Sequence, residues 1–341
     1  MRYPAFLQEH GTIGFVAPSF GAFIEPYHTC FDRSLEVFQK MGYKTLLGPN
    51  VYKGDGIGIS TDPASCGREL TDFYCASDSD VLISVGGGEC MCETMSNVDL
   101  ERIAKAEPKW YMGYSDNTNF GFLLPTLFDT ASLYAPCAAE FSMEPWHPSL
   151  YDHMNFLTGK DLLSHGYDLW EKERVRDEAS PFAPYNVTEP TKVLFKNWEG
   201  TPVSGRLLGG CLDILINFCG TRFDHVKAFT EKYREDGVIW FLEACDLTVF
   251  SIRRALWQLK EAGWFDTAKA FVIGRPVLFD QEIMGLDRIE AVMGILKDFN
   301  VPVVLDADLG HLPPMMPMLN GGFGTLKPYK ENNIQIQFEL K

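Results

Sequence analysis

The sequence predicts an α/β protein in which a parallel sheet is covered by helices on both faces. Short, continuously apolar segments alternate with segments whose apolar residues recur at helical spacing. Strands that are apolar on both sides are typical of parallel sheets buried between helices. Turns rich in glycine, proline or serine follow several of the apolar segments. In such sheets the ligand crevice lies at the carboxyl ends of the strands.

The first third of the chain carries the clearest alternation. Apolar runs predict strands at 12–17, 81–85 and 110–113, and apolar residues at helical spacing predict helices at 31–41 and around 100–104. Each strand is followed by a segment that breaks the pattern. These segments are Pro18-Ser19, Gly86-Gly87-Gly88 and the turn at Ser115. We expect all three at the same edge of the sheet.

The pattern degrades between about 140 and 200, where prolines and tryptophans stand among charged residues. We interpret this region as an interdomain excursion that is partly helical around Tyr151–Leu163. The regular pattern then returns. The later predicted strands are 203–208, 238–242, 270–273, 301–305 and 334–338, with a helix at 249–262. This organisation predicts two domains, 1–135 and 201–341, joined by 136–200.

Composition excludes several classes of function. The 341 residues include 46 acidic and 30 basic side chains, for a net charge of −16, which argues against a nucleic-acid partner. No apolar run has the length of a membrane span, and no signal-peptide core follows Met1, so we expect a cytoplasmic protein that does not bind membranes. The nine cysteines are an odd, scattered set, typical of reduced thiols.

The histidines and cysteines lack the spacing of a metal site, so we predict no metal. Gly86-Gly87-Gly88-Glu89 matches neither the dinucleotide fingerprint nor a P-loop, and Glu89 would repel a phosphate. We therefore predict no cofactor. The amides of this glycine loop are instead suited to face an oxyanion.

The segment 109–118 places a serine between the end of a strand and the start of a helix. It is β-prone up to Gly113, breaks, presents Ser115, and continues with helical spacing over 119–124. Such a turn pushes a serine hydroxyl into a cleft, where the first helical amides can stabilise an oxyanion. Asn117 stands where the usual elbow pattern has a glycine, so a helix-capping role for Ser115 stays open.

Glu243 directly follows the five apolar residues of the 238–242 strand. A carboxylate in that position is partly buried and needs a partner, because an unpaired buried charge is costly. The residue could serve an active site. It could equally cap the following helix or pair with Arg253 or Arg254.

His311 follows the 301–305 strand, with Gly310 before it and Pro313-Pro314 close behind. A loop this constrained can hold an imidazole in a fixed position, although a lone loop histidine is more often a surface residue. Ser115, Glu243 and His311 thus stand in this order, each after a strand. That arrangement predicts a catalytic triad in which a glutamate orients the histidine.

These residues carry a family resemblance. Gly113-Tyr114-Ser115-Asp116, Leu242-Glu243 and Leu309-Gly310-His311, with Pro317–Leu319 and Asn320-Gly321-Gly322 downstream, resemble the LD-carboxypeptidase family of serine peptidases. That family includes the murein tetrapeptide carboxypeptidases and the microcin C self-immunity peptidases. The resemblance runs from Ile13 to about Leu326.

The resemblance implies a flavodoxin-like N-terminal sheet domain, a smaller swivelling C-terminal α/β domain, an active site between them, and a homodimer. It implies that Ser115 is the nucleophile, His311 the general base and acid, and Glu243 the group that fixes the histidine tautomer. The amide of Asp116 and one amide from Gly87 or Gly88 would form the oxyanion hole. Glu89-Cys90 departs from the aromatic or small residues expected after that loop.

Two substrates compete within the family: the terminal D-alanine bond of a murein tetrapeptide, and the amide that joins an aminoacyl group to a modified nucleotide. Chain length and the region 140–200 favour the second. There, Trp146, Trp170 and Trp198 would stack on a base, or alternatively pack a domain interface. A reading from another class is a non-catalytic flavodoxin-like protein that binds a nucleotide or flavin.

Overall fold

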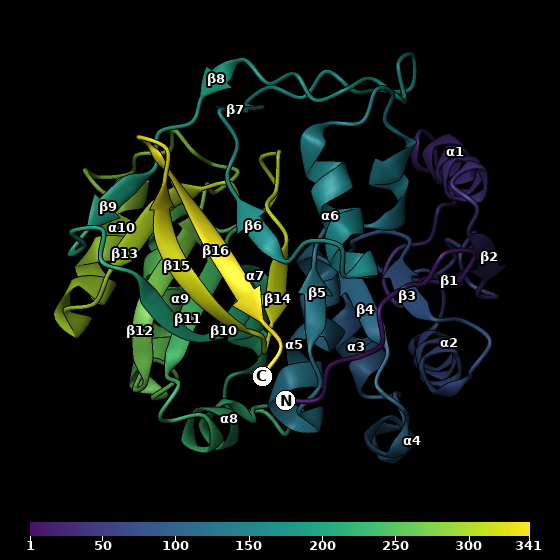
Figure 1. Ribbon diagram of the computed structural model, residues 1–341, viewed down its shortest axis with the longest axis horizontal. Helices are drawn as coiled ribbons and strands as arrows, with labels where there is room; N and C mark the ends of the chain where they lie inside the picture. Colours follow the sequence, from purple (N-terminus) through teal and green to yellow (C-terminus); the bar gives the residue numbers. More distant parts are fainter.

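Two sheets lie side by side in the computed structural model, which describes residues 1–341 (Figure 1). The mixed α/β architecture confirms the predicted fold class. The first sheet has six strands in the order β14-β5-β4-β3-β1-β2. These strands are β1 (Thr12–Val16), β2 (Lys44–Leu47), β3 (Val81–Ser84), β4 (Trp110–Gly113), β5 (Ser132–Tyr134) and β14 (Met318–Asn320).

Strands β1 to β5 run parallel, and β14 pairs antiparallel with β5. All residues of β3 and β4 are buried, as their continuous apolar sequences indicate. The helices of this half are α1 (Tyr27–Lys40), α2 (Pro63–Cys75), α3 (Met91–Met95), α4 (Leu100–Lys105) and α5 (Thr118–Phe128). Helix α2 begins with Pro63, and the Asp62 carboxylate accepts a hydrogen bond from the Ser65 amide.

The second sheet has eight strands in the order β6-β16-β15-β10-β11-β12-β13-β9. Its parallel centre consists of β10 (Val203–Cys211), β11 (Val238–Glu243), β12 (Ala268–Gly274) and β13 (Val303–Ala307). Antiparallel strands complete both sides: β6 (Leu163–His165), β9 (Leu194–Lys196), β15 (Phe323–Tyr329) and β16 (Asn333–Glu339). The helices are α7 (Leu212–Phe218), α8 (Val226–Lys232), α9 (Val249–Glu261) and α10 (Arg288–Leu296).

The region between the two halves is more regular than its sequence indicates. Helix α6 covers Pro148–Thr158 rather than 151–163. It starts early because Pro148 occupies its first turn, and it ends at Gly159, which adopts a left-handed conformation with φ of 69°. Leu163 instead begins β6. The region also supplies β9, so both outer strands of the second sheet come from it.

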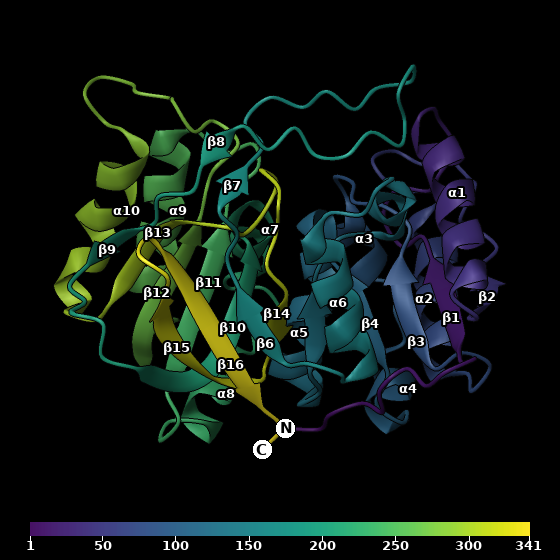
Figure 2. The same cartoon turned by 45° about the horizontal axis from the view of Figure 1, so that its top comes forward.

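Residues 171–188, here called the strap, join the two-residue strands β7 (Leu169–Trp170) and β8 (Glu189–Pro190). The strap leaves the second half of the molecule at β7 and β8 and runs across the top of the first half towards α1 (Figures 1 and 2). Arg176 fixes the far end, because its guanidinium contacts Sγ of Cys30 in α1 at 3.1 Å. A single excursion therefore connects both halves.

Two large apolar clusters form the core, and each contains residues from both sheets. One includes Phe15 of β1 together with Phe241 of β11 and Phe338 of β16. The halves therefore share a continuous core, and β14 ties them further because it belongs to the first sheet but follows His311 in the chain. No helix combines the length and the apolar character that crossing a membrane requires.

Candidate active site

Ser115 occupies a sharp turn at the carboxyl end of β4. Its φ of 61° lies in the left-handed region, which a serine adopts only when its surroundings impose it. A short 3-10 turn, Ser115–Asn117, leads directly into α5. Asn117 supports the turn by donating from Nδ2 to the Gly86 carbonyl at 2.8 Å. The Ser115 side chain caps neither helical segment, so the capping interpretation is wrong.

The Ser115 hydroxyl instead contacts an imidazole from the other half of the molecule. Oγ lies 2.9 Å from Nε2 of His311, and Nδ1 of His311 lies 2.8 Å from Oε2 of Glu243. Glu243 is the last residue of β11, and His311 lies in the loop after β13. The structure thus brings together the three residues that the sequence singled out.

Gly310 makes the approach of His311 to Glu243 possible. Its φ is 100°, and a Cβ at this position would lie 2.5 Å from Oε2 of Glu243. Glu243 does not cap α9, because Thr248 caps that helix. It does not pair with an arginine either, because its ion-pair partner is His311. Its second oxygen, Oε1, accepts a hydrogen bond from the Tyr134 hydroxyl at 2.6 Å. Both carboxylate oxygens therefore have partners, as a buried charge requires.

The partners of His311 and Glu243 together outweigh the effect of burial on the pKa of each residue. Burial disfavours the imidazolium, but the Glu243 carboxylate and the nearby Cys245 hold the pKa of His311 well above its usual value. Burial likewise disfavours ionised Glu243, yet its contacts with His311 and Tyr134 hold the pKa of Glu243 below its usual value. Glu243 is therefore ionised at neutral pH, and it stabilises positive charge on His311.

The glycine loop after β3 lies against Ser115. A Cβ on Gly87 would meet Cβ and Oγ of Ser115 at 3.4 Å, and a Cβ on Gly88 would meet Oγ of Ser19 at 2.0 Å. The Asp116 amide belongs to the first turn after Ser115, where amides have no helical acceptor. Gly87 therefore lies directly beside Ser115, and Asp116 follows the serine in the same turn.

The Asp116 side chain points away from this group and into the protein. One carboxylate oxygen accepts hydrogen bonds from Oγ of Ser19 at 2.5 Å and from the Met91 amide at 2.9 Å. Asn119 donates to the other oxygen at 2.9 Å. Burial raises the pKa of Asp116 to about 6, although these hydrogen bonds oppose the increase. Asp116 therefore links the nucleophile turn to the segment that follows β1 and to the first residue of α3.

Ser115 and His311 open onto a cavity of about 310 Å³. One wall is apolar and comes from the segment between β1 and α1. Phe23, Ile24 and Tyr27 on that wall are 41%, 50% and 45% exposed, although exposed side chains of this size are usually polar. Sequence reasoning missed this wall. The run Phe20-Gly21-Ala22-Phe23-Ile24, apolar in a loop after a strand end, was the available signal.

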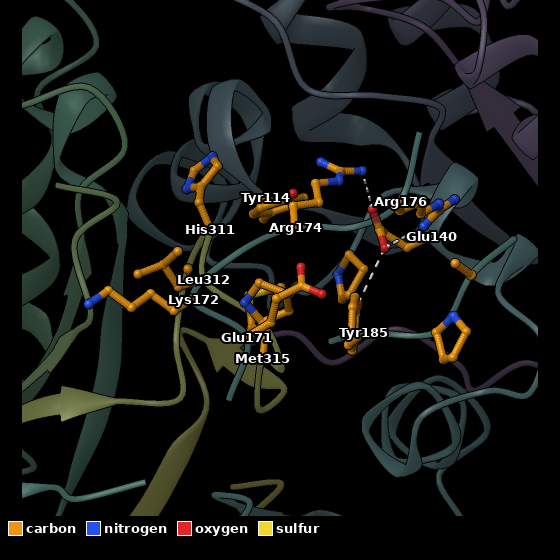
Figure 3. Close-up of a pocket in the computed structure, with 15 residues that line it drawn as sticks. Tyr114, Glu140, Glu171, Lys172, Arg174, Arg176, Tyr185, His311, Leu312 and Met315 are labelled. Carbon is orange, nitrogen blue, oxygen red and sulfur yellow. Dashed lines mark hydrogen bonds and ion pairs between the residues drawn. The ribbon is translucent and has the colours of Figure 1, made fainter. Parts of the chain in front are cut away.

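A second, smaller cavity of about 90 Å³ adjoins the first on the side of His311 (Figure 3). Tyr114, Glu140, Arg174 and His311 line both cavities. Glu140 lies between two arginines of the strap, with Arg176 at 3.0 Å and Arg174 at 3.9 Å. The strap therefore brings positive charge to the site, which its irregular sequence did not indicate.

The three tryptophans expected to bind substrate line neither cavity. Trp146 packs on Phe141 and Tyr151, and Trp198 packs on Phe195. Trp170 is 5% exposed, and its ring lies 4.7 Å from the Arg275 guanidinium carbon. Each ring is thus occupied by packing contacts.

No group of three or more histidine, cysteine, aspartate or glutamate side chains is arranged to hold a metal ion. All nine cysteines are free thiols. The groups that meet at Ser115 are a hydroxyl, an imidazole and a carboxylate. A serine nucleophile is activated when its hydroxyl is hydrogen-bonded to a histidine and that histidine is hydrogen-bonded to a buried carboxylate.

Comparisons with known proteins identify the family of the chain. Residues 13–135 match the LD-carboxypeptidase N-terminal domain, and residues 204–326 match the LD-carboxypeptidase C-terminal domain. The microcin C7 self-immunity protein MccF of Escherichia coli is 27% identical over 319 residues, which cover 90% of this chain and 88% of that protein. A putative carboxypeptidase of Vibrio cholerae is 23% identical over 96% of this chain and 95% of its own length.

Solved structures of related proteins share the fold. MccF in complex with aspartyl sulfamoyl adenosine superposes with a TM-score of 0.82 at 22% identity, over 99% of both chains. An MccF-like protein from Bacillus anthracis superposes with a TM-score of 0.81 at 19% identity, over 99% of this chain and 100% of its own. The two domain matches, in the order and at the positions that the sequence motifs indicated, show that this chain belongs to the LD-carboxypeptidase family of peptidases.

Proposed function

We propose that this protein is a serine-dependent amide hydrolase in which Ser115, His311 and Glu243 form the catalytic triad. One observation carries the proposal: an unbroken hydrogen-bonded chain runs from Oγ of Ser115 through both nitrogens of His311 to buried Glu243. The cavity above Ser115 gives a substrate access to the hydroxyl. The strained φ at Ser115 adds support, because backbone strain of this kind is typical of nucleophile turns.

The geometry supports the following sequence of steps. Ser115 Oγ attacks the scissile carbonyl while Nε2 of His311 accepts its proton, and the imidazolium is stabilised by Glu243. The amide of Asp116 and that of Gly87 or Gly88 bind the oxyanion. His311 then donates the proton to the leaving nitrogen, and an acyl group stays on Ser115. Water, deprotonated by His311, releases that acyl group and restores the serine.

For the substrate, we propose the amide of an aminoacyl-nucleotide. A relative that covers most of the chain is a microcin C7 self-immunity protein, and related structures hold aspartyl sulfamoyl adenosine or glutamyl sulfamoyl guanosine. The cavity offers a place for a base in this chain: the exposed rings of Phe23 and Tyr27 are flat apolar surfaces of the kind on which bases stack. We assign stacking to these two residues because the three tryptophans lie elsewhere.

A murein tetrapeptide, cleaved to release terminal D-alanine, is the second candidate. The family description and the putative carboxypeptidases among the relatives favour it. The contacts among Ser115, His311 and Glu243 argue against a non-catalytic nucleotide- or flavin-binding protein, because such a protein would give the three residues no function.

We also propose that the protein is a homodimer and that each chain consists of a domain at 1–135, an interdomain segment at 136–200 and a domain at 201–341. We propose further that the protein resides in the cytoplasm. The family resemblance supports the first two proposals. The nine free thiols support the third, because reduced cysteines are typical of a reducing compartment. Sedimentation equilibrium would measure the oligomeric state, and a single monomeric species at micromolar concentration would contradict the dimer.

Incubation of the wild type and Ser115→Ala with a murein tetrapeptide and with an aminoacyl sulfamoyl adenosine, followed by mass spectrometry, tests the activity. Release of the free amino acid from the nucleotide supports the first substrate, and release of D-alanine supports the second. In either case Ser115→Ala is expected to lower turnover by roughly 10⁴- to 10⁶-fold. A variant that keeps most of the activity would exclude the triad.

A further inference from the structure

Arg174 presents a free guanidinium to the cavity that contains the nucleophile. It lies on the strap, beside Tyr114 in the smaller cavity (Figure 3), and it borders both cavities. Its side chain is 53% exposed. Among the residues that line the larger cavity, it is the only arginine or lysine. The chain as a whole has a net charge of −16, so this side chain is an isolated positive group beside Ser115 on an otherwise acidic protein.

Arg176, the neighbouring arginine of the strap, differs from Arg174 in its hydrogen bonding. Arg176 donates hydrogen bonds to Glu140, to Ser142 and to the Ala139 and Pro181 carbonyls, and its side chain is 6% exposed. These contacts anchor the strap. Arg174 donates no hydrogen bond within the chain, and its nearest carboxylate oxygen, Oε1 of Glu140, is 3.9 Å away. Its planar set of donors is therefore available to a ligand.

Glu140 does not neutralise Arg174. The other oxygen of Glu140 is bound by Arg176 at 3.0 Å and by the Tyr185 hydroxyl at 3.3 Å. One carboxylate thus faces two guanidinium groups, and the nearer guanidinium takes the short contact. Glu171 and Lys172 also line the smaller cavity and Glu89 the larger one, but the one carboxylate within 4 Å of the Arg174 guanidinium is that of Glu140.

The position of Arg174 corresponds to the leaving-group side of the scissile bond. His311 borders both cavities, whereas Ser115 borders only the larger one. In the proposed mechanism His311 protonates the leaving nitrogen, so the leaving group lies on the His311 side of Ser115. Arg174 lines that side as well. Both candidate substrates carry negative charge there. In the tetrapeptide it is on the carboxylate, one carbon from the scissile nitrogen of D-alanine. In the aminoacyl-nucleotide it is on a phosphoryl group bonded to that nitrogen, or on an ionised acyl sulfamate whose nitrogen shares the charge with the sulfonyl oxygens.

We propose that Arg174 is a specificity-determining residue that binds the anionic group of the leaving portion of the substrate through paired N–H donors. Arginine is suited to this function because its planar fork matches the oxygens of carboxylate, phosphoryl and sulfamoyl groups. The inference rests on the proposed function, and it adds the reason why a substrate of this class has a charged leaving group. It predicts that a substrate with a neutral leaving group is hydrolysed poorly.

Two matched substrate pairs test the proposal. One is a tetrapeptide that ends in D-alanine, beside the same peptide ending in D-alaninamide. The other is an aminoacyl sulfamoyl adenosine, beside the neutral amide of the same amino acid with 5′-amino-5′-deoxyadenosine. We expect Arg174→Met to lower kcat/KM for the anionic member of the hydrolysed pair by about 10- to 100-fold, mainly through KM. The neutral member should change by less than about threefold.

Arg174→Lys, which keeps the charge but removes the fork, should recover part of the loss. Arg254→Met removes an exposed arginine on α9 and serves as the control for overall charge. Because Arg174 donates no hydrogen bond within the chain, its replacement should leave the thermal unfolding temperature unchanged.

Equal losses on the anionic and neutral members would overturn the proposal, since the contribution of Arg174 would then not depend on the anion. Whichever pair the wild type hydrolyses identifies the anion as carboxylate or sulfamoyl. A wild type that hydrolyses neither pair would instead refute the proposed function, and the inference with it. Labelling of Ser115 by a serine-directed phosphonate would show whether the nucleophile itself is active in that case.

Discussion

Replacement of Glu243 by glutamine tests how much of the proposed catalysis depends on the buried charge. The change preserves shape, so the contacts to His311 at 2.8 Å and Tyr134 at 2.6 Å can persist as hydrogen bonds. It removes the carboxylate that stabilises the imidazolium formed in the transition state. Two unit charges about 4 Å apart attract by about 4 kcal/mol at an effective dielectric of about 20, which corresponds to roughly 10³-fold in rate.

The glutamine amide also permits the wrong histidine tautomer, in which Nε2 carries a proton and cannot accept one from Ser115. Together the two effects predict a fall in kcat of about 10³- to 10⁴-fold. The pH profile adds a second readout. His311 must be neutral to act as a base, so activity rises with pH through its pKa, which Glu243 raises. Without the carboxylate, burial dominates and lowers the pKa of His311. The acidic limb of the profile should therefore move to lower pH.

The assay is kcat/KM against pH for the wild type and Glu243→Gln, on a substrate without titrating groups between pH 5 and 9. The raised pKa of His311 also contributes stability that is fully present below about pH 6.5 and is lost as the pH rises through the folded-state pKa. Glu243→Gln should lack that contribution, which thermal unfolding at several pH values would measure. A variant within tenfold of wild-type activity, with its acidic limb in place, would refute the reasoning.

Three other substitutions give further tests. Gly88→Ala places a Cβ 2.0 Å from Oγ of Ser19, so we expect the glycine loop to shift. We expect kcat to fall by about 10²-fold or more, and phosphonate labelling of Ser115 to slow in parallel. Unchanged kinetics would exclude this loop from the oxyanion hole. Asp116→Asn removes a buried carboxyl whose pKa is raised to about 6. A raised folded-state pKa favours the wild type at low pH, so its unfolding free energy relative to the variant should be higher at pH 4 than at pH 7 by roughly 2 kcal/mol. A constant difference between pH 4 and 7 would contradict the burial of this group. Phe23→Ala should raise KM for the aminoacyl-nucleotide by about 5- to 50-fold and leave the tetrapeptide nearly unaffected; equal effects on both substrates would remove the stacking assignment.

The elements that the sequence predicts are those with a strong local pattern. Strands β1, β3, β4 and β11 are continuous apolar runs because they are buried on both faces, and they precede the segments that form the site. Short strands carry no such pattern. Strand β14 has three residues and owes its conformation to pairing with β5, which is almost two hundred positions earlier in the chain. Pairing at that separation leaves no local trace.

The same contrast divides the candidate site. Ser115, Glu243 and His311 were accessible to sequence reasoning because each ends or follows a strand at the edge where such sheets bind ligands. Arg174 was not, because the strap has no periodicity and its position depends on the contacts of Arg176. Trp170 was misleading because tryptophan is equally suited to stacking on a base and to filling a seam. Only the surrounding contacts distinguish these two environments.

The position of β14 has a consequence for biosynthesis. Residues 318–320 are synthesised almost two hundred positions after β5, yet they cover its edge in the first sheet. Until then, a nascent chain that has completed β5 presents an open strand edge able to pair with another chain. The same late segment follows the loop that carries His311. Both the closure of that edge and the arrival of the imidazole at Ser115 therefore require the segment 311–320, and a nascent chain that lacks this segment has no assembled triad.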